Sequence, residues 1–196
     1  MNISSLFPAY EEYENYSECY RKIIEADDAL VDVKYGQLDI YTKKPIKDKV
    51  SDDVILVCKP DQLMKYKVGT CWDQSLYTYA RLKKDLGTAN VRAIGYAYTD
   101  AHNKITTHTT IIAKDTIIAK DRKDYYWTEH AWDEQQGVHG PYKSVDIITC
   151  EIKSYLPKSS KIFIWKDNLN AVYDKLLAQN KDISAKQFAT EVFNFK

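Results

Sequence analysis

Both ends of the chain carry patterns that predict helices. From position 9 to 26, apolar or aromatic side chains recur at helical spacing, acidic residues come early, and Arg21 and Lys22 come late. This arrangement predicts an amphipathic helix whose charges match the helix dipole. Near the other end, the segments 169–179 and 184–193 are expected to form two closing helices.

A long helix is predicted in the centre of the chain, over positions 71–86. Its sequence, CWDQSLYTYARLKKDL, places apolar residues on one face, and Gly87 follows as a stop signal. Thr70 is a suitable N-cap, and Asp73 at the third helical position completes a capping-box pattern. Cys71 is therefore expected at the positive end of a helix.

Strand patterns surround this helix. The short apolar run at 54–60, with Cys58 inside it, indicates a buried strand, and most of the others follow the central helix. The expected strands, in chain order, lie within 30–42 and at 54–60, 91–99, 105–113, 124–132, 144–156 and 161–166. Helices and antiparallel strands in this order predict the α+β class, and 196 residues are enough for a single domain spanning 1–196.

Two short segments complete the expected fold. A short helix is predicted at 61–67, with Gly69 as its C-cap. The segment GVHGPY at 137–142 looks like a shaped loop near the cleft.

Composition narrows the classes of partner. Hydrophobic residues make up 44% of the chain, which supplies a packed core without disulfides, and the four cysteines are scattered without a CxxC pair. Lys plus Arg equals Asp plus Glu at 28 each, so the charge balance favours neither nucleic acid nor an anionic membrane as a partner. The sequence shows no membrane span and no export signal near its start, so we expect a cytoplasmic protein.

The candidate chemistry centres on KVGTCWDQ, positions 67–74. A cysteine attacks as its thiolate, and a helix start together with a nearby imidazole favours that form. The glycine before the cysteine is expected to let the backbone approach a substrate. Without a helix start and a nearby imidazole, Cys71 would be interpreted as a core residue, because free cysteine is among the most buried residue types.

Three segments together resemble a known family. VGTCWDQSLYTYARLKKDLG, THTTIIAKD and KDYYWTEHAWDEQQGVHGPY resemble the transglutaminase-like branch of the papain-like cysteine enzymes, notably bacterial and phage members. The matching stretch covers about 68–142, under half of the chain. The resemblance implies a papain/transglutaminase-like core at about 54–142, with the N-terminal helix 9–26 and a C-terminal extension 143–196 added to it.

The resemblance also implies roles for individual residues. In that family a cysteine at a helix start is the nucleophile, a histidine on the following strand region is the base, and an acid on the next strand orients the imidazole. Carried over, Cys71 would be the nucleophile, His108 in THT the general base and acid, and Glu129 in WTEH the orienting acid. The family more often has aspartate in the third place, and glutamate is one methylene longer.

Further residues are candidates for the cleft. The family's oxyanion hole includes the backbone N–H of the cysteine, which a first-turn position leaves available. Gln62 is a possible additional donor, and Trp72 could wall the acyl pocket. His130 follows the acid and should point to the other side of its strand, so we expect a structural role, with a substrate-side role as the alternative. His139 is expected near the cleft without a catalytic role.

An internal duplication bears on the choice of acid. Residues 110–121 read TIIAKDTIIAKD, a direct repeat between His108 and Glu129. If one copy forms an enlarged loop, expected at about 115–123, that pair is preserved. If the hairpin lengthens instead, Asp133 comes opposite His108 and becomes the alternative acid. We favour the loop, because a slipped register would discard the packing of a whole strand.

Two functions from different classes follow. The first is cysteine-dependent acyl transfer or hydrolysis on an amide or ester of a peptide or protein, through an acyl-thioester, with no cofactor and no metal. The second is a binding module that keeps the cleft without turnover. An acyl-CoA-dependent transferase is a weaker third possibility, since no glycine-rich phosphate site is present. Cysteine and histidine are also zinc ligands, but no CxxC or HExxH pair supports a zinc site.

Overall fold

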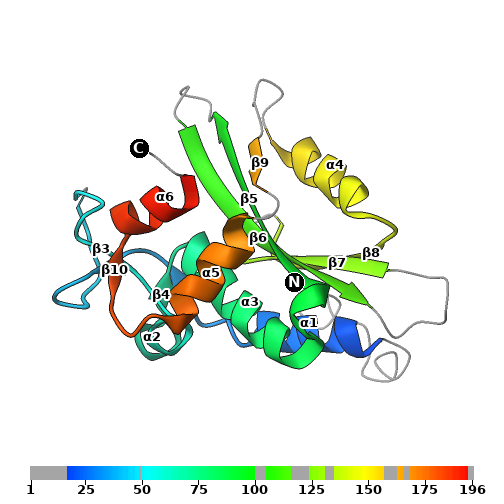
Figure 1. Cartoon of the computed structure of the whole chain (residues 1–196), viewed down its shortest axis with the longest axis horizontal. Coiled ribbons are helices and arrows are strands. Elements are labelled where there is room, and N and C mark those ends of the chain that lie inside the picture. Colours follow the sequence, from blue (N-terminus) through cyan, green and yellow to red (C-terminus); the bar gives the residue numbers. More distant parts are fainter. Residues whose placement is uncertain are drawn as a thin grey trace, which may run out of the picture.

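A computed structural model describes residues 17–48, 50–99, 105–115, 124–130, 135–156, 163–165 and 168–193. The fold is α+β, with helices on both sides of an antiparallel sheet (Figure 1). The helices are α1 (Glu18–Asp28), α2 (Pro60–Tyr66), α3 (Cys71–Leu86), the 3₁₀ turn η3 (Thr88–Asn90), α4 (Val145–Tyr155), α5 (Asn168–Ala178) and α6 (Ala185–Phe193).

The main sheet has the strand order β8-β7-β6-β5-β9, and every neighbouring pair is antiparallel. Its strands are β5 (Val91–Thr99), β6 (Ile105–Asp115), β7 (Asp124–Glu129), β8 (Gly137–Tyr142) and β9 (Phe163–Trp165). Two small sheets lie beside it, one with the order β10-β3-β2 and one pairing β1 with β4. Their strands are β1 (Lys34–Tyr35), β2 (Leu38–Asp39), β3 (Ile55–Val57), β4 (Val68–Gly69) and β10 (Ile183–Ser184).

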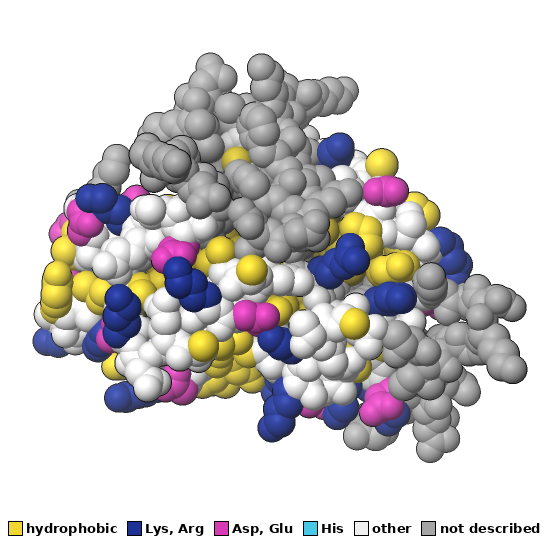
Figure 2. Space-filling view, viewed as in Figure 1, with side chains coloured by type: hydrophobic (Ala, Val, Ile, Leu, Met, Phe, Trp, Pro, Cys, Tyr) yellow, Lys and Arg dark blue, Asp and Glu magenta, His cyan; other side chains and the backbone are white. Residues whose placement is uncertain are grey.

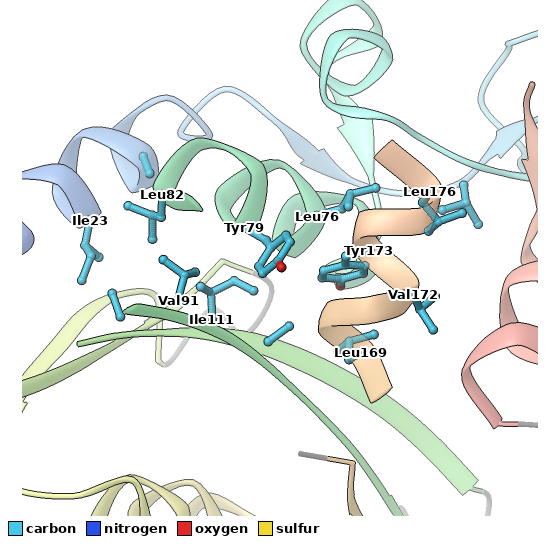
Figure 3. Close-up of a cluster of buried hydrophobic side chains, with 14 of the residues drawn as sticks. Ile23, Leu76, Tyr79, Leu82, Val91, Ile111, Leu169, Val172, Tyr173 and Leu176 are labelled. Carbon is cyan, nitrogen blue, oxygen red and sulfur yellow. The ribbon is translucent and has the colours of Figure 1, made fainter. Parts of the chain in front are cut away.

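The largest core lies between the sheet and the helices α1, α3 and α5. Figure 3 shows Tyr79 of α3 and Tyr173 of α5 facing each other above the sheet, and their ring centroids are 5.5 Å apart. Both side chains are fully buried. A second cluster, which includes Ile148 and Ile152, packs α4 against the opposite face of the sheet. The sheet is therefore covered on both faces, which fixes the strands that carry the candidate chemistry.

Most expected elements are confirmed. The central helix has the predicted bounds, Cys71–Leu86, and β5 has those of the predicted strand 91–99. The 54–60 run contains β3, in which all three residues are buried. The N-terminal helix is present as α1, while the part of the prediction before residue 17 lies outside the described residues.

Segment 144–156 was expected to form a strand, and this prediction is wrong. It forms α4, capped by Ser144, whose side chain accepts a hydrogen bond from the backbone of Ile147. The buried residues Ile148, Ile152 and Leu156 are spaced four apart, so one helix face packs on the sheet. Tertiary burial outweighs the strand preference of the β-branched residues in this segment.

Two smaller predictions are corrected. The segment 137–142 is not a loop but strand β8, which pairs with β7. The short helix α2 ends at Lys67, which has φ 54° in the left-handed region, so Gly69 is not its C-cap. Gly69 belongs instead to β4.

The described surface carries charges of both signs. Figure 2 shows Lys or Arg and Asp or Glu side chains interspersed over the described part of one face. Among the described residues, no helix is long and apolar enough to cross a membrane.

Candidate active site

The start of α3 is held in place by the buried carboxylate of Asp73. Its Oδ2 accepts hydrogen bonds from the backbone N–H of Thr70 at 2.6 Å and from the Thr70 hydroxyl at 2.8 Å. Its Oδ1 accepts a third from the backbone N–H of Cys58 at 2.7 Å. Burial raises the pKa of Asp73 to about 6, although these hydrogen bonds act in the opposite direction. The predicted cap thus also ties the residue after β3 to the helix that begins with Cys71.

Gly69 fits this arrangement because it has no side chain. A Cβ at this position would lie 2.4 Å from Cδ1 of Leu63 and 2.9 Å from Cβ of Asp73. The glycine therefore allows a close approach of the backbone to α2 and to the helix cap. Its approach to a substrate stays a prediction.

His108 and Glu129 form a buried pair on neighbouring strands. The distance from His108 Nε2 to Glu129 Oε2 is 2.7 Å, and the two residues are 4% and 2% exposed. The strands pair with Ile111 opposite Thr128, so Glu129 continues the register opposite Thr110 and meets His108 diagonally. A diagonal neighbour is within reach of a long side chain, which glutamate provides.

Cys71 and Glu129 both act on the imidazole of His108, and the Glu129 carboxylate is bonded to its Nε2. Burial by itself would lower the pKa of His108, but the hydrogen bonds with Cys71 and Glu129 outweigh it and raise the pKa to about 10. The site therefore favours the imidazolium form. Cys71 itself is 4% exposed.

The other thiols have different surroundings. Burial raises the pKa of Cys19 to about 12, and it also raises the pKa of Cys58. Both belong to hydrophobic clusters. Cys150 is a free, exposed cysteine on α4.

Tyr35 is a site residue that sequence reasoning missed. Tyr35 interacts with Cys71, and it pairs with Gly69 in the parallel β1–β4 ladder, two residues before the cysteine. Desolvation of the hydroxyl, followed by the charges of Cys71 and Asp73, raises the pKa of Tyr35 to about 12. The residue as a whole is 64% exposed, so it lies at the entrance of the site. Only the parallel pairing of two short strands brings it there. The alternation at 30–42 predicts strands, but it does not show which distant segment they pair with.

A cavity of about 230 Å³ reaches the Cys71 residue. Tyr35, Trp72 and Thr107 line it, together with Phe188 from α6. Trp72 thus lies where a wall of the pocket was expected. Its ring meets the ring of Phe188 edge-on, with centroids 5.1 Å apart.

Gln62 is not at this cavity. Its Oε1 accepts a hydrogen bond from the backbone N–H of Lys59 at 3.0 Å, and its Nε2 donates to Asp182 at 2.6 Å. The amide caps α2 and is engaged away from Cys71, so the structure does not place it as an oxyanion donor.

His130 contacts the helices α1 and α3 and does not line the cavity. Its Nδ1 lies 2.8 Å from Asp27 of α1 and its Nε2 lies 3.0 Å from the hydroxyl of Thr78 of α3. The side chain is 7% exposed. This residue links the end of β7 to two helices, which is the structural role expected for it.

His139 packs on the sheet. Its ring stacks on Trp127 with centroids 4.2 Å apart, and its Nε2 lies 2.7 Å from the backbone oxygen of Gln135. It does not line the cavity at Cys71. The alternative acid Asp133 lies outside the described residues, as does the expected loop from 116 to 123, while Asp115 pairs with Asp124 at the end of the hairpin.

Comparisons with known proteins identified no protein similar to this chain. No model of a known protein family matches the chain, and neither does any curated protein or solved structure. Among the described residues, no three His, Cys, Asp or Glu side chains gather where they could hold a metal ion.

Proposed function

We propose that the chain is a cysteine-dependent acyltransferase or hydrolase that acts on an amide or ester of a peptide or protein. The observation that carries the proposal is the position of His108, whose imidazole contacts the Cys71 side chain and the Glu129 carboxylate together. A helix that begins at the thiol and packs on an antiparallel sheet carrying the histidine and the acid supports a papain/transglutaminase-like core.

The proposed reaction has two steps. The Cys71 thiolate attacks the carbonyl carbon, the backbone N–H of Cys71 donates to the developing oxyanion, and His108 gives its proton to the leaving amine or alcohol as the C–N or C–O bond breaks. Water or a second amine then attacks the thioester, His108 takes its proton, and the C–S bond breaks to regenerate the Cys71 thiolate beside protonated His108. Glu129 stabilises the imidazolium and orients its ring in both steps.

The mechanism requires that Cys71 reacts as a thiolate near neutral pH. Thiol alkylation at controlled pH tests this requirement. Iodoacetamide labelling is followed by peptide mapping, with the exposed Cys150 as a reference thiol in the same molecule. We expect Cys71 to label faster than Cys150 at pH 6 despite its burial, because the imidazolium supports a thiolate. His108→Ala should remove this advantage without changing the labelling of Cys150.

The mechanism also requires that Cys71 forms an acyl-thioester, which an acylation experiment tests. Wild-type protein incubated with p-nitrophenyl acetate should release p-nitrophenolate in a burst and gain one acetyl group on Cys71, as measured by intact mass and peptide mapping. Cys71→Ala should show neither. Acetylation confined to lysines or to Cys150 would refute the proposal.

A binding module without turnover is the second candidate. It is favoured by the 4% exposure of Cys71 and by the hydroxyl of Tyr35 against its side chain, which together restrict access to the sulfur. This function predicts that Cys71 labels more slowly than Cys150 at pH 6 and reacts only as pH rises through about 8.5, the ordinary range of a thiol.

A further inference from the structure

The cavity at Cys71 has one wall from the C-terminal part of the chain, outside the stretch that carries the family resemblance. Ala185, Phe188 and Ala189 of α6 line it. They are spaced three and four residues apart, so they share one face of the helix. Two of the three are alanines, and this leaves space beside Phe188.

This wall is held in position by packed contacts. The Phe188 ring lies 5.1 Å from the Trp72 ring and 6.4 Å from the Tyr173 ring, measured between centroids. Strand β10, which leads into α6, pairs with β3, whose residues also line the cavity. The α6 face is therefore fixed relative to the thiol at the start of α3.

The lining combines apolar and polar side chains in about equal measure, and its apolar part includes Trp72 and Phe188. Its charged members are Asp52 and the buried Asp73, and the described residues that line it include no Lys, Arg or His. An uncharged apolar group in the cavity would contact Trp72 and Phe188, while the charged side chains of the lining, Asp52 and Asp73, would repel an anionic group that lies away from the His108 imidazolium.

The volume limits the size of the occupant. A cavity of about 230 Å³ is smaller than the roughly 300 Å³ at which pockets for drug-sized ligands begin. At roughly 30 Å³ for each water-sized group, it holds on the order of seven or eight heavy atoms. One amino-acid side chain or a short acyl chain has this size.

We propose that this cavity is the acyl subsite, that it takes an uncharged apolar group attached to the reacting carbonyl, and that Ala189 on α6 sets its length limit. The proposal rests on the proposed function, because the group it recognises is the one transferred to Cys71. The C-terminal extension thereby determines substrate choice.

A series of p-nitrophenyl esters tests the proposal. The rate of thioester formation on Cys71 is measured with the acetate and the hexanoate, each divided by its rate with N-acetylcysteine. Burial of each added methylene should raise the corrected rate by up to about four-fold. We expect the hexanoate to exceed the acetate by at least about ten-fold in the wild-type protein.

Ala189→Phe should remove this preference, so that the corrected rate with the hexanoate falls to that with the acetate, because the added ring fills part of the cavity. Ala171→Phe, at an exposed position of α5, is the matched control and should retain the wild-type preference. If Ala189→Phe does not give the wild-type circular dichroism spectrum, Ala185→Leu is measured in its place with the same expectation. Equal corrected rates for the two esters in the wild-type protein, or an equal loss of both in the variant, would overturn the subsite and leave the thioester chemistry intact.

Alkylation distinguishes failure of the proposed function from failure of the acyl subsite. Iodoacetamide, N-hexyl iodoacetamide and the anion iodoacetate are compared on Cys71, which requires no turnover. If no ester acylates Cys71 but the N-hexyl reagent is still preferred and Ala189→Phe removes that preference, the proposed function fails while the apolar recognition by α6 is supported. If the anion reacts as fast as iodoacetamide and the hexyl group gives no advantage, the subsite itself is refuted.

Discussion

Replacing Glu129 by glutamine isolates the contribution of its charge. The carboxylate is 2.7 Å from His108 Nε2 and is 2% exposed, so it has almost no access to solvent. Glutamine keeps the size of the side chain and its ability to accept a hydrogen bond, but it removes the negative charge. The fold should therefore be retained while the imidazolium loses its partner.

The magnitude follows from this hydrogen bond. A hydrogen bond to a charged group contributes about 1.5–3 kcal/mol, and each pKa unit corresponds to about 1.36 kcal/mol. The pKa of His108, which the hydrogen bonds with Cys71 and Glu129 raise to about 10, should fall by about one to two units in the variant. The thiolate–imidazolium pair should then become about 10- to 100-fold less populated relative to the neutral pair.

The assay is iodoacetamide alkylation of Cys71 across pH 5.5–10, followed by peptide mapping. At pH 6 the variant should react about 10- to 100-fold more slowly than wild type, and the difference between the two rates should shrink as the pH rises through the pKa of His108, about 10. A ratio that does not change with pH would indicate general damage and refute the reasoning. Asp133→Asn measured alongside decides between the two acids, because a larger pH-dependent loss in that variant would make Asp133 the partner of His108.

Three other substitutions separate the parts of the site. Tyr35→Phe should slow acylation by p-nitrophenyl acetate about ten-fold by removing a hydrogen-bond donor to Cys71, and an unchanged rate would exclude a role for the hydroxyl. Asp73→Asn should lower the free energy of unfolding by about 2–4 kcal/mol, because an amide group would face three N–H and O–H donors; a loss below about 0.5 kcal/mol in urea denaturation would contradict this. His130→Ala should cost about 1–3 kcal/mol by removing the imidazole that bonds to Asp27 and to Thr78, which leaves Asp27 with the Thr128 hydroxyl. Cys71 should still label at the wild-type rate at pH 6, so a selective loss of labelling would assign His130 to the chemistry.

The elements that sequence reasoning placed correctly are those with local signals. The bounds of α3 follow from Thr70 and Asp73 at one end and Gly87 at the other, and the structure uses each of them. Helix capping involves residues within four positions of one another, so a single sequence carries the information.

The elements that it missed depend on distant partners. Helix α4 is decided by burial of Ile148 and Ile152 against the sheet, which outweighs local strand preference. Strand β8 contains Gly140 and Pro141, which are loop signals, yet pairing with β7 makes it a strand. Tyr35 reaches Cys71 only through the parallel pairing of β1 with β4. The alternation at 30–42 predicts a strand at Tyr35, but a single sequence does not show which distant strand it pairs with.

The register of the β6–β7 hairpin gives a physical reason for glutamate at position 129. The sequence suggested two alternatives, with either Glu129 or Asp133 directly opposite His108. The observed pairing lies between them, because Glu129 continues the register opposite Thr110 and bonds diagonally to the imidazole. An aspartate at position 129 would be one methylene shorter and would have to span the same diagonal. The longer acid and the offset register thus compensate each other, so glutamate in this place does not by itself favour the binding module over the enzyme.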